Sequence, residues 1–267
     1  MSNLNIYRSK FESHLIDKVE YIDSMYIIHQ NLFDYSKYLS KTGISKIEIF
    51  EENLIMTFKD SGVKMICVEG DKRIACLDSL NFLGYEEEEL LMQYQLIEKN
   101  DVVFDIGGNY GWYSIHVSKK IPSSKIYTFE PVPNTFSILN KNIELNSAKN
   151  VQSFNLGLSN EVGELTFFCD PNLTVNASLS NVNDNPNAIE VSCKVDVLDS
   201  FVSKNAIEKL DFIKCDIEGA ELFALLGAKN SINKFKPKIF IEMLRKWAAK
   251  FNYHPNEIIF FLKELGY

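Results

Sequence analysis

The feature that most constrains the fold is a regular alternation of short apolar segments with helical segments from residue 101 onward. Five short segments read as buried strands, at 102–106, 125–129, 151–156, 210–215 and 238–243. Helical segments lie between or after them, at 111–120, 134–146, 219–227 and 255–265. Such alternation is typical of a parallel sheet covered on both faces. The sequence therefore predicts an α/β fold with a mostly parallel sheet and helices on both faces.

One stretch interrupts the alternation. Residues 164–168 and 189–197 have the pattern of an added hairpin, and the asparagine-rich stretch 172–187 joins them. Long polar segments between strands often serve as lids over active sites. We therefore predict a loop at 172–187 that covers a bound acceptor.

The N-terminal part of the chain has a different pattern. Apolar residues recur at steps of three or four up to about residue 40, which predicts helix. Four short β-rich segments follow and predict an antiparallel meander, at 47–50, 54–58, 63–68 and 73–77. The segment 86–98 predicts a helix with acidic residues in its first turn. We therefore divide the chain into a helical and β-meander extension at 1–84 and an α/β domain at 85–267.

Charge and composition exclude several classes of protein. The 28 basic and 36 acidic residues give a net charge of −8, which argues against a protein that binds nucleic acid through its phosphates. No apolar run approaches the roughly 18 residues of a membrane span, and the N-terminus lacks the apolar core of a signal peptide. The five cysteines form no C-x-x-C pair and read as buried reduced thiols. We expect a cytoplasmic protein with no nucleic-acid partner and no membrane span.

The sharpest motif is DIGGNYGWYS at 105–114, which follows a predicted strand and opens a helix. Gly107, Gly108 and Gly111 allow a tight turn and a close approach of a ligand to the backbone. The spacing is D-x-G-x-N-x-G rather than G-x-G-x-x-G. A carboxylate at Asp105 would repel a pyrophosphate, but it suits a cationic amino-acid ligand such as S-adenosylmethionine. The alternative is a structural glycine turn in which Asp105 only holds loop amides.

A second acidic residue follows at the end of the next strand. Glu130 lies in FEPVPN, 25 residues after Asp105. An acid at this point of a strand–helix–strand unit typically binds a ribose diol, because a carboxylate can accept hydrogen bonds from both hydroxyls. A solvated glutamate at a strand end is the alternative. Together with the glycine motif, Glu130 indicates a cofactor that contains a nucleoside.

A third motif, KCDIEGAE, places charge inside a strand that reads as buried. Lys214, Asp216 and Glu218 alternate and therefore point to one side at the carboxyl end of the sheet, where open α/β sheets bind ligands. Glu242 ends the next strand at the same edge. Buried charges are costly unless they are paired. We predict a catalytic cluster of Lys214, Asp216 and Glu242; a purely structural ion pair of Lys214 with Asp216 or Glu242 is the alternative.

In this order, the motifs resemble those of the FkbM family of class I S-adenosylmethionine-dependent methyltransferases. The matching pieces are DIGGN-x-G-x-x-S, FEPVPN, D-x-I-K-x-D-I-E-G-A-E and the late I-E strand. Shorter likenesses occur at 156–160, 177–180 and 195–201. The resemblance covers roughly residues 85–267 and implies a Rossmann-like fold that carries out O-methylation, commonly of a sugar or natural-product hydroxyl. The net charge of −8 favours a neutral acceptor such as a sugar over an anionic one.

The resemblance also implies a set of cofactor contacts in the glycine loop, after the second strand and after the third. The expected S-adenosylmethionine-binding residues are Asp105, Gly107, Gly108, Asn109, Tyr110, Gly111, Glu130, Pro131, Asn134 and Leu158. Asp216 matches the family's fourth-strand acid, which lies near the methyl group and the acceptor.

Methylation of an aliphatic hydroxyl needs a general base or a metal ion, because the hydroxyl is a weak nucleophile. We expect Asp216 and Glu242 to act as base or to hold a magnesium-type cation through hard oxygen atoms. Lys214 would order these carboxylates or contact the acceptor. His116 is a weaker base candidate, and helix packing explains it better. Tyr110 and Trp112 fit stacking on the acceptor or adenine and core packing equally well.

The chain departs from the family pattern at its C-terminal end. A class I methyltransferase sheet has a sixth strand and an antiparallel seventh, and here the sequence stops where the sixth begins. We expect a sheet short of two strands, with its edge completed by the 47–80 meander, by a neighbouring subunit of a homo-oligomer, or by further domains of a longer chain. Two other functions stay open: a catalytically silent cofactor-binding module of a larger glycan-modifying protein, and an NAD-dependent oxidoreductase.

Overall fold

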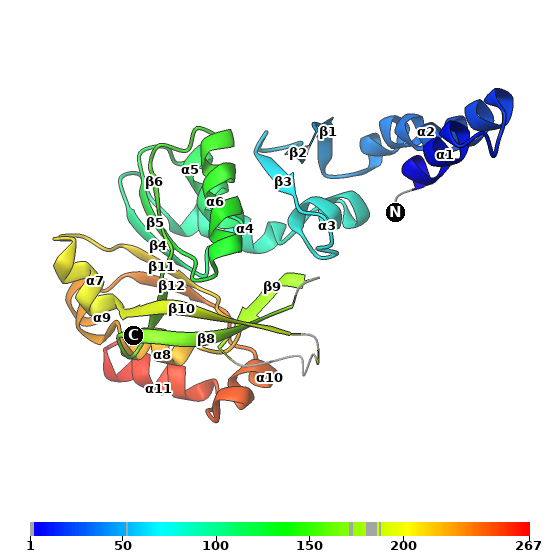
Figure 1. The fold of residues 1–267 in the computed structure, drawn as a ribbon. Coiled ribbons are helices and arrows are strands. Elements are labelled where there is room, and N and C mark those ends of the chain that lie inside the picture. Colours follow the sequence, from blue (N-terminus) through cyan, green and yellow to red (C-terminus); the bar gives the residue numbers. More distant parts are fainter. Residues whose placement is uncertain (1–2, 52, 171–172, 180–185, 187) are drawn as a thin grey trace.

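A five-stranded parallel sheet forms the centre of the computed structural model, which describes residues 3–51, 53–170, 173–179, 186 and 188–267 (Figure 1). Its strands run in the order β12-β11-β4-β5-β6. Their bounds are Val102–Ile106 (β4), Lys125–Phe129 (β5), Val151–Phe154 (β6), Phe212–Cys215 (β11) and Lys238–Ile241 (β12). The order steps outward in both directions from β4, as in Rossmann-like folds. The predicted α/β fold with a mostly parallel sheet is confirmed.

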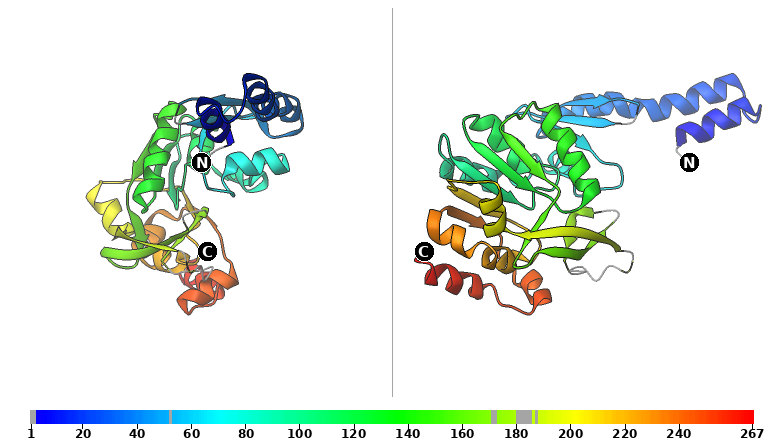
Figure 2. Two further views of the ribbon diagram at one scale, coloured as in Figure 1. Left: turned by 45° about the vertical axis from the view of Figure 1, so that its right-hand side comes forward. Right: turned by 60° about the vertical axis from the view of Figure 1, so that its left-hand side comes forward.

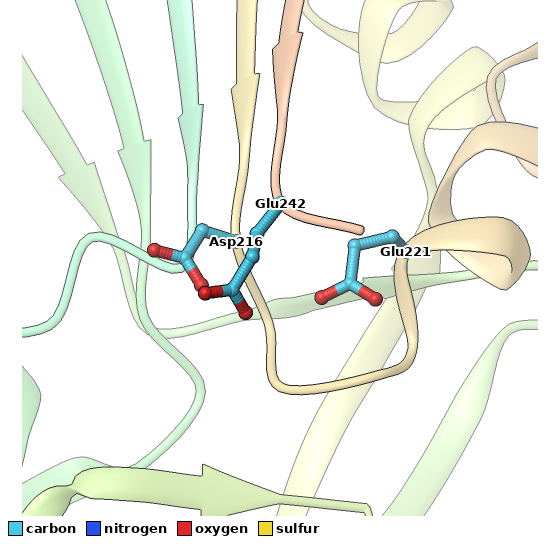
Figure 3. A group of neighbouring side chains, drawn as sticks. All are labelled: Asp216, Glu221 and Glu242. Atoms are coloured by element: carbon cyan, nitrogen blue, oxygen red, sulfur yellow. The ribbon is translucent and has the colours of Figure 1, made fainter. Parts of the chain in front are cut away.

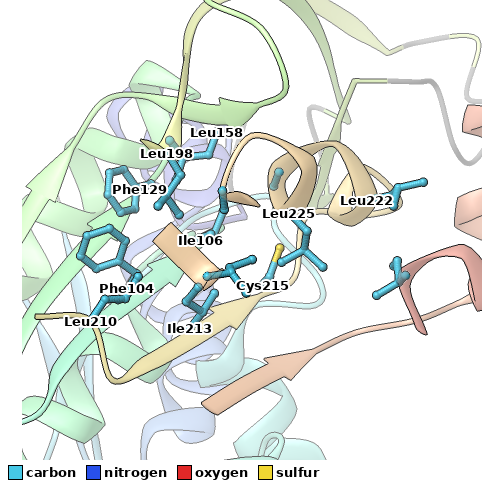
Figure 4. Close-up of a cluster of buried hydrophobic side chains, with 14 of the residues drawn as sticks. Phe104, Ile106, Phe129, Leu158, Leu198, Leu210, Ile213, Cys215, Leu222 and Leu225 are labelled. Atoms are coloured by element: carbon cyan, nitrogen blue, oxygen red, sulfur yellow. The ribbon is translucent and has the colours of Figure 1, made fainter. Parts of the chain in front are cut away.

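Helices cover both faces of this sheet because alternate strand residues point to opposite sides. Phe104 and Ile106 of β4 pack in the core shown in Figure 4, together with the helices α7, α8, α9 and α11. Val103 packs on the other face, against the side of α4, α5 and α6. The helix bounds are Glu87–Leu96 (α4), Trp112–Lys120 (α5), Pro133–Leu145 (α6), Leu198–Lys204 (α7), Glu221–Leu226 (α8), Lys229–Phe235 (α9), Arg245–Ala248 (α10), Ala249–Phe251 (η2) and Asn256–Glu264 (α11).

The interrupting segment forms a second, four-stranded sheet in the order β7-β10-β8-β9. Its strands are Gly157–Ser159 (β7), Gly163–Asp170 (β8), Leu173–Ser178 (β9) and Ile189–Val197 (β10). The antiparallel pairing of β8 with β10 confirms the predicted hairpin. The prediction of a loop throughout 172–187 is wrong for β9, whose backbone pairs with β8. Residues 171–172, 180–185 and 187 lie outside the described part of the chain, and with them half of the predicted lid.

The N-terminal extension consists of a helical hairpin, a small sheet and a further helix. The hairpin comprises Asn3–Glu12 (α1) and Lys18–Tyr38 (α2), and a short turn of helix follows at Leu39–Lys41 (η1). The strands Ile44–Ile49 (β1), Leu54–Phe58 (β2) and Lys64–Cys67 (β3) form the predicted antiparallel meander.

The fourth predicted meander strand, at 73–77, is wrong, because helix Ala75–Phe82 (α3) begins there. Ala75, Cys76, Ser79 and Leu80 are buried at helical spacing. Periodicity alone does not separate a short apolar strand from the start of such a helix.

The meander packs against the helices α5 and α6, which cover one face of the central sheet, and it does not extend the sheet. The backbone N–H groups of Lys64 and Ile66 donate to the side-chain oxygens of Asn146 and Asn142, at 2.8 and 2.9 Å. These asparagines close an edge of β3 that would otherwise be open to other strands. The option that the meander completes the central sheet is therefore wrong. In the described part of the chain no strand pairs with the outer edge of β12, and no helix is long and apolar enough to cross a membrane.

Candidate active site

A cavity of about 320 Å³ opens at the carboxyl end of the central sheet, beside β4 and β11. After β4 the chain continues to β5 on one side of the sheet, and after β11 it continues to β12 on the other side. Open α/β sheets bind ligands at such a switch point. The volume is at the lower end of that of small-molecule sites. The lining includes these predicted residues: Gly107, Gly108, Asn109, Tyr110, Glu130, Pro131, Lys214, Asp216 and Glu242.

The glycine loop lies so close to its neighbours that side chains would not fit. Gly107 has φ +86°, and a Cβ atom there would collide with the carbonyl oxygen of Asp216. A Cβ atom at Gly108 would collide with the Thr128 hydroxyl. The N–H groups of both glycines donate to the carbonyl oxygen of Phe129, at 3.1 and 2.9 Å. The loop is therefore fixed against β5 and against the segment after β11.

Asp105 lies beneath this loop, outside the residues that line the cavity. It is paired in register with Lys214 on β11, and its Oδ1 lies 3.7 Å from Lys214 Nζ. Ser114 Oγ donates to Asp105 Oδ2 at 2.5 Å. Burial raises the pKa of Asp105, while Lys214 and Ser114 counteract that rise. Asp105 thus ties the start of α5 to the neighbouring strand and keeps an ion pair directly under the loop.

Glu130 is held by the backbone on both carboxylate oxygens. Its Oε2 accepts from the N–H of Asn109 at 3.0 Å, and its Oε1 accepts from that of Val132 at 2.9 Å. The side chain is 5% exposed, and burial raises its pKa to about 7 against the lowering effect of the two amides. Each carboxylate oxygen can accept a second hydrogen bond. Glu130 is therefore fixed in place with accepting capacity to spare at the cavity wall.

Three other predicted cofactor residues lie away from the cavity lining. Gly111 caps the start of α5 with φ +93°, and a Cβ atom there would press on Leu139 and Ile115. Asn134 is exposed in the first turn of α6. Leu158, on β7, is buried in the main core.

The three predicted catalytic residues meet at the end of β11 and β12. Asp216 directly follows β11 and Glu242 directly follows β12, so the two side chains lie at adjacent strand ends (Figure 3). Lys214 Nζ lies 3.4 Å from Asp216 Oδ2 and donates to the carbonyl oxygen of Gly107 at 3.2 Å. Burial acts to lower the pKa of Lys214, but the charges of Asp216 and Asp105 outweigh it and raise that pKa. Lys214 therefore stays an ammonium ion between the two halves of the site.

The carboxylates here repel one another. Burial raises the pKa of Glu242 to about 7, with further contributions from Asp216 and Glu221. Burial also raises the pKa of Glu218 to about 8, assisted by Asp216 and Glu242. Raised carboxyl pKa values in a cleft are characteristic of functional sites. Such a cluster favours uptake of a proton or of another cation.

Oxygen atoms of Asp216, Glu221 and Glu242 lie within 4.8 Å of one another (Figure 3). Glu221 already has other partners: its Oε1 accepts from the N–H groups of Ile217 and Gly219, both at 3.0 Å, and its Oε2 accepts from the Tyr253 hydroxyl at 3.3 Å. Glu221 therefore holds the loop after β11. Asp216 and Glu242 supply the hard oxygen donors that Mg²⁺ prefers, so the donor chemistry fits such an ion.

One wall of the cavity is formed by residues that belong to none of the predicted motifs. Glu86 lines it with φ +44°, and its Oε2 accepts from the Tyr113 hydroxyl at 2.7 Å. Lys214 Nζ lies 4.9 Å from the centre of the Tyr113 ring. Glu86 is the first of four consecutive glutamates, which in the sequence indicate only a helix start. Met65, Arg73, Ile74 and Ala75 complete this wall from the N-terminal extension.

His116 and Trp112 serve packing. His116 is buried, and its ring nitrogens lie 2.8 Å from the carbonyl oxygen of Trp112 and 3.0 Å from Ser61 Oγ. Burial lowers the pKa of His116 to about 4. The Trp112 ring makes edge contacts with Phe58 and Tyr85 and also borders the cavity. The packing interpretation of His116 is confirmed, and the Trp112 ring, which packs in the core, also lines the cavity.

Comparisons with known proteins agree with this geometry. The methyltransferase FkbM domain matches residues 105–267. Methyltransferase sdnD of Sordaria araneosa is 30% identical over 159 residues, which covers 49% of this chain and 61% of that protein. Methyltransferase 1 of Beauveria bassiana is 30% identical over 142 residues, covering 47% and 57%. Hexuronic acid methyltransferase AglP of Haloferax volcanii is 26% identical over 147 residues, covering 55% and 58%. The chain thus matches less than two thirds of the length of each of these relatives.

Proposed function

Because the chain belongs to the FkbM methyltransferase family, we propose that it transfers the methyl group of S-adenosylmethionine to a hydroxyl oxygen of an acceptor. The observation that carries this proposal is the row Asp105, Lys214 and Asp216 at the switch point of the sheet, in which Asp105 and Lys214 are buried under the glycine loop and the half-buried Asp216 lines the cavity. A sulfonium cofactor supplies an activated methyl group beside these charges. The acceptor we propose is a sugar, a glycan or a natural product.

We assign the donor side of the cavity to the glycine loop and Glu130. Gly107 and Gly108 line the cavity, and their close packing against Asp216 and Thr128 fixes the loop at the cavity wall. Glu130 is fixed by the amides of Asn109 and Val132, and its remaining accepting capacity suits the two ribose hydroxyls. Pro131 and Tyr110 complete this wall. We keep Gly111 in the set as the residue that shapes the loop.

We assign Asp216 and Glu242 to the acceptor. In methyl transfer the acceptor oxygen attacks the methyl carbon while the carbon–sulfur bond breaks on the opposite side, so most of the acceleration comes from alignment. The hydroxyl proton must leave, and a nearby carboxylate can take it. A base works best when its pKa lies near the working pH, and that of Glu242 is raised to about 7. Lys214 positions Asp216 through its ammonium group, 3.4 Å away.

A divalent cation is the second role open to the same pair. Asp216 and Glu242 would hold it, and it would supply Lewis-acid activation of the hydroxyl. Turnover in the presence of a chelator separates the two roles. Loss of turnover that Mg²⁺ restores indicates the cation, whereas unchanged turnover leaves the carboxylates as bases.

Calorimetry with three ligands tests the cofactor. The proposal expects S-adenosylmethionine and S-adenosylhomocysteine to bind and NAD not to bind. Binding of NAD without the two sulfur compounds would show an oxidoreductase. A catalytically silent module would bind S-adenosylhomocysteine but transfer no methyl group to any extract of candidate acceptors.

The chemical class of the acceptor is tested in a separate experiment. One relative is named as a hexuronic acid methyltransferase, which supports a sugar. Cells that lack the protein should contain a glycan or metabolite lighter by about 14 daltons, the mass of one CH₂ group, and mass spectrometry detects that loss. We place the reaction in the cytoplasm, since all five cysteines are free thiols and reducing compartments maintain them.

A further inference from the structure

The N-terminal extension packs against α4 and α5 on one side of the molecule (Figure 2). A second cavity, of about 370 Å³, lies at this junction, and it is bordered by β2 with the turn after it, by α3, and by α4 and α5. Ligand sites occur preferentially where two parts of a molecule meet, and this volume suits a ligand of one or two rings. The methyl transfer proposed above does not use this space, which we name the extension cavity.

Apolar and aromatic side chains form part of the wall of the extension cavity. Phe58 of β2 and Trp112 of α5 both line it, and their rings meet edge to face with centres 4.9 Å apart. Leu90 and Tyr94 add apolar surface from α4, and Leu91, which is 57% exposed, lies at the rim. Trp112 also lines the active-site cavity. Such a wall suits a flat aromatic ligand, because aromatic rings pair edge to face or offset-stacked.

Two buried polar atoms of the lining residues have no hydrogen-bond partner in the part of the chain that the structure describes. They are Oγ of Ser79, whose exposed fraction is 0%, and Nε1 of Trp112, whose exposed fraction is 8%. Buried polar groups nearly always have a partner, so these atoms indicate a polar ligand. The indole N–H only donates, so the ligand must supply an acceptor. His116 has no such capacity left, because both of its ring nitrogens already have partners.

Lysine side chains give the extension cavity a positive charge. Its charged residues sum to +1 in a chain that carries −8, and they are Lys59, Lys119, Lys120, Asp60 and Glu87. None of the three lysines forms a salt bridge within the described residues. The carboxylate of Glu87 lies so close to Gly84 that a Cβ atom on Gly84 would collide with it. The cations at this cavity are therefore not neutralised by carboxylates of the surrounding chain.

Two of these lysines have N–H donors left for a ligand. Lys59 is occupied, because its Nζ donates to three backbone carbonyl groups just after α2. Lys119 Nζ donates to the carbonyl oxygen of Gly62 at 2.6 Å, and an ammonium group has three N–H groups. Lys120 Nζ lies 5.6 Å from the centre of the Tyr94 ring. Lys119 and Lys120, which both line the cavity, can therefore bind an anionic group of a ligand.

The active-site cavity has the opposite charge. Its lining carries two basic and five acidic residues, which sum to −3: Arg73, Lys214, Glu86, Glu130, Asp216, Glu218 and Glu242. A positively charged cofactor suits that balance, whereas an anion suits the extension cavity. The two cavities therefore favour ligands of opposite charge, although Trp112 borders both.

We propose that the extension cavity binds a small aromatic carboxylate. The ring of this ligand packs against Phe58 and Trp112, and its carboxylate lies at the ammonium groups of Lys119 and Lys120. The carboxylate also supplies the acceptor that a donor-only indole N–H needs. A ligand with several negative charges suits the cavity less, because the charged lining residues sum to only +1.

Calorimetry of the full chain with 2-naphthoate and its neutral isostere 2-naphthamide tests the proposal. We expect one 2-naphthoate to bind per chain with a dissociation constant on the order of 100 μM, and 2-naphthamide to bind at least about tenfold more weakly. Saturating S-adenosylhomocysteine should leave this affinity unchanged. Displacement by S-adenosylhomocysteine would place the ligand in the active-site cavity and overturn the proposal, as would a folded chain that binds no 2-naphthoate at about 5 mM. Equal affinity for the two compounds would overturn the assignment of a carboxylate ligand.

Paired lysine variants test where the carboxylate binds. Lys119→Gln combined with Lys120→Gln should weaken 2-naphthoate binding about tenfold and leave the affinity for 2-naphthamide nearly unchanged. Lys141→Gln combined with Lys263→Gln is the matched control, because it removes the same charge from exposed positions outside the cavity lining. Equal 2-naphthoate affinity of the two double variants would overturn the position of the carboxylate.

A substitution at the rim tests where the ring binds. Leu91→Asp places a carboxylate at the cavity and should weaken binding of both compounds, that of 2-naphthoate by about tenfold or more. Met92→Asp is its control, because Met92 is the next residue on α4, is 50% exposed and does not line the cavity. Circular dichroism and urea denaturation establish that each variant is folded. A folded Leu91→Asp variant that binds 2-naphthoate as tightly as Met92→Asp does would overturn the location of the site.

Discussion

The two sides of the cavity hold their functional groups in place by different interactions. On the donor side, backbone hydrogen bonds fix the functional groups. Backbone N–H groups donate to both carboxylate oxygens of Glu130, and the N–H groups of the glycine loop donate to the carbonyl oxygen of Phe129 on β5. On the acceptor side, Asp216, Glu218 and Glu242 are crowded together, and burial and mutual repulsion raise the pKa of both glutamates. The first arrangement is preorganised for binding, whereas the second keeps groups ready to take up a proton or a cation.

This contrast predicts that the two sides respond differently to substitution. Changes on the donor side should alter ligand affinity and folding, because its groups are part of the backbone hydrogen-bond network. Changes on the acceptor side should alter turnover and leave the affinity for S-adenosylhomocysteine nearly intact. Gly107 connects the two sides. Its carbonyl oxygen accepts a hydrogen bond from Lys214, and its Cα packs against the carbonyl group of Asp216.

The largest effect is expected from Asp216→Asn. Loss of this carboxylate removes a base or metal ligand and the closest carboxylate partner of Lys214, so turnover of an identified acceptor should fall about 1,000-fold. Calorimetry should show S-adenosylhomocysteine affinity within about threefold of the wild type. Asp60→Asn, at an exposed turn of the extension, is the control. Turnover that survives in Asp216→Asn would disprove both roles assigned to this residue.

Gly107→Ala should disrupt the contact between the two sides of the cavity. The new methyl group would collide with the carbonyl oxygen of Asp216, and the φ of +86° is strained for alanine. Both effects should lower the free energy of unfolding by about 3 kcal/mol and abolish S-adenosylhomocysteine binding. Gly163→Ala on β8 is the matched control, because a Cβ atom there has no neighbour within 4 Å in the described structure. Equal stability of the two variants in urea denaturation would contradict the close packing of the loop.

Glu130→Gln should isolate the donor side. The glutamine keeps the shape but presents an NH₂ group to one of the two backbone amides that need an acceptor. We expect S-adenosylhomocysteine affinity to fall about 30-fold, or about 2 kcal/mol, with kcat at saturating cofactor nearly unchanged. Glu190→Gln, exposed on β10, serves as the control. A fall in kcat without a fall in affinity would show that Glu130 belongs to the acceptor side of the cavity.

Local signals predicted the central sheet well. The strands at 102–106 and 125–129 match the structure at both ends, because each is a short apolar run that meets its helix through a glycine- or proline-rich turn. The order of the motifs also brought Lys214, Asp216 and Glu242 to one edge of the sheet, since parallel strands end on the same side. Periodicity and topology were sufficient for this part of the site.

The rest could not be predicted, because it depends on contacts between distant segments. Glu86 and Arg73 belong to no motif. Arg73 follows the meander, which packs on α5 and α6, and Glu86 reaches the cavity at the start of α4, where it meets Tyr113 of α5. The 73–77 segment has the pattern of a strand because residues 74–77 form an apolar run, whereas the burial of Ser79 and Leu80 one turn later belongs to a helix. This wall of the cavity is thus a product of tertiary packing, and no local sequence motif marks it.

The smallest expected effect is a pH dependence that separates the two sides within the wild-type protein. The pKa of Glu242 is raised to about 7, and a base works only when deprotonated, so kcat should rise about tenfold per pH unit below 7 and level off near pH 8. Burial also raises the pKa of Glu130 to about 7, and because we propose that Glu130 binds the cofactor, its titration should affect KM for the cofactor instead. Measurements at saturating S-adenosylmethionine therefore report the carboxylates of the acceptor side, which include Glu218 with a pKa raised to about 8, and a variant of Glu242 separates the two glutamates. In Glu242→Gln the rise should disappear while the pH dependence of cofactor binding remains. A rise that persists in this variant would assign the base to another group, and the crowded carboxylates would then act only through charge.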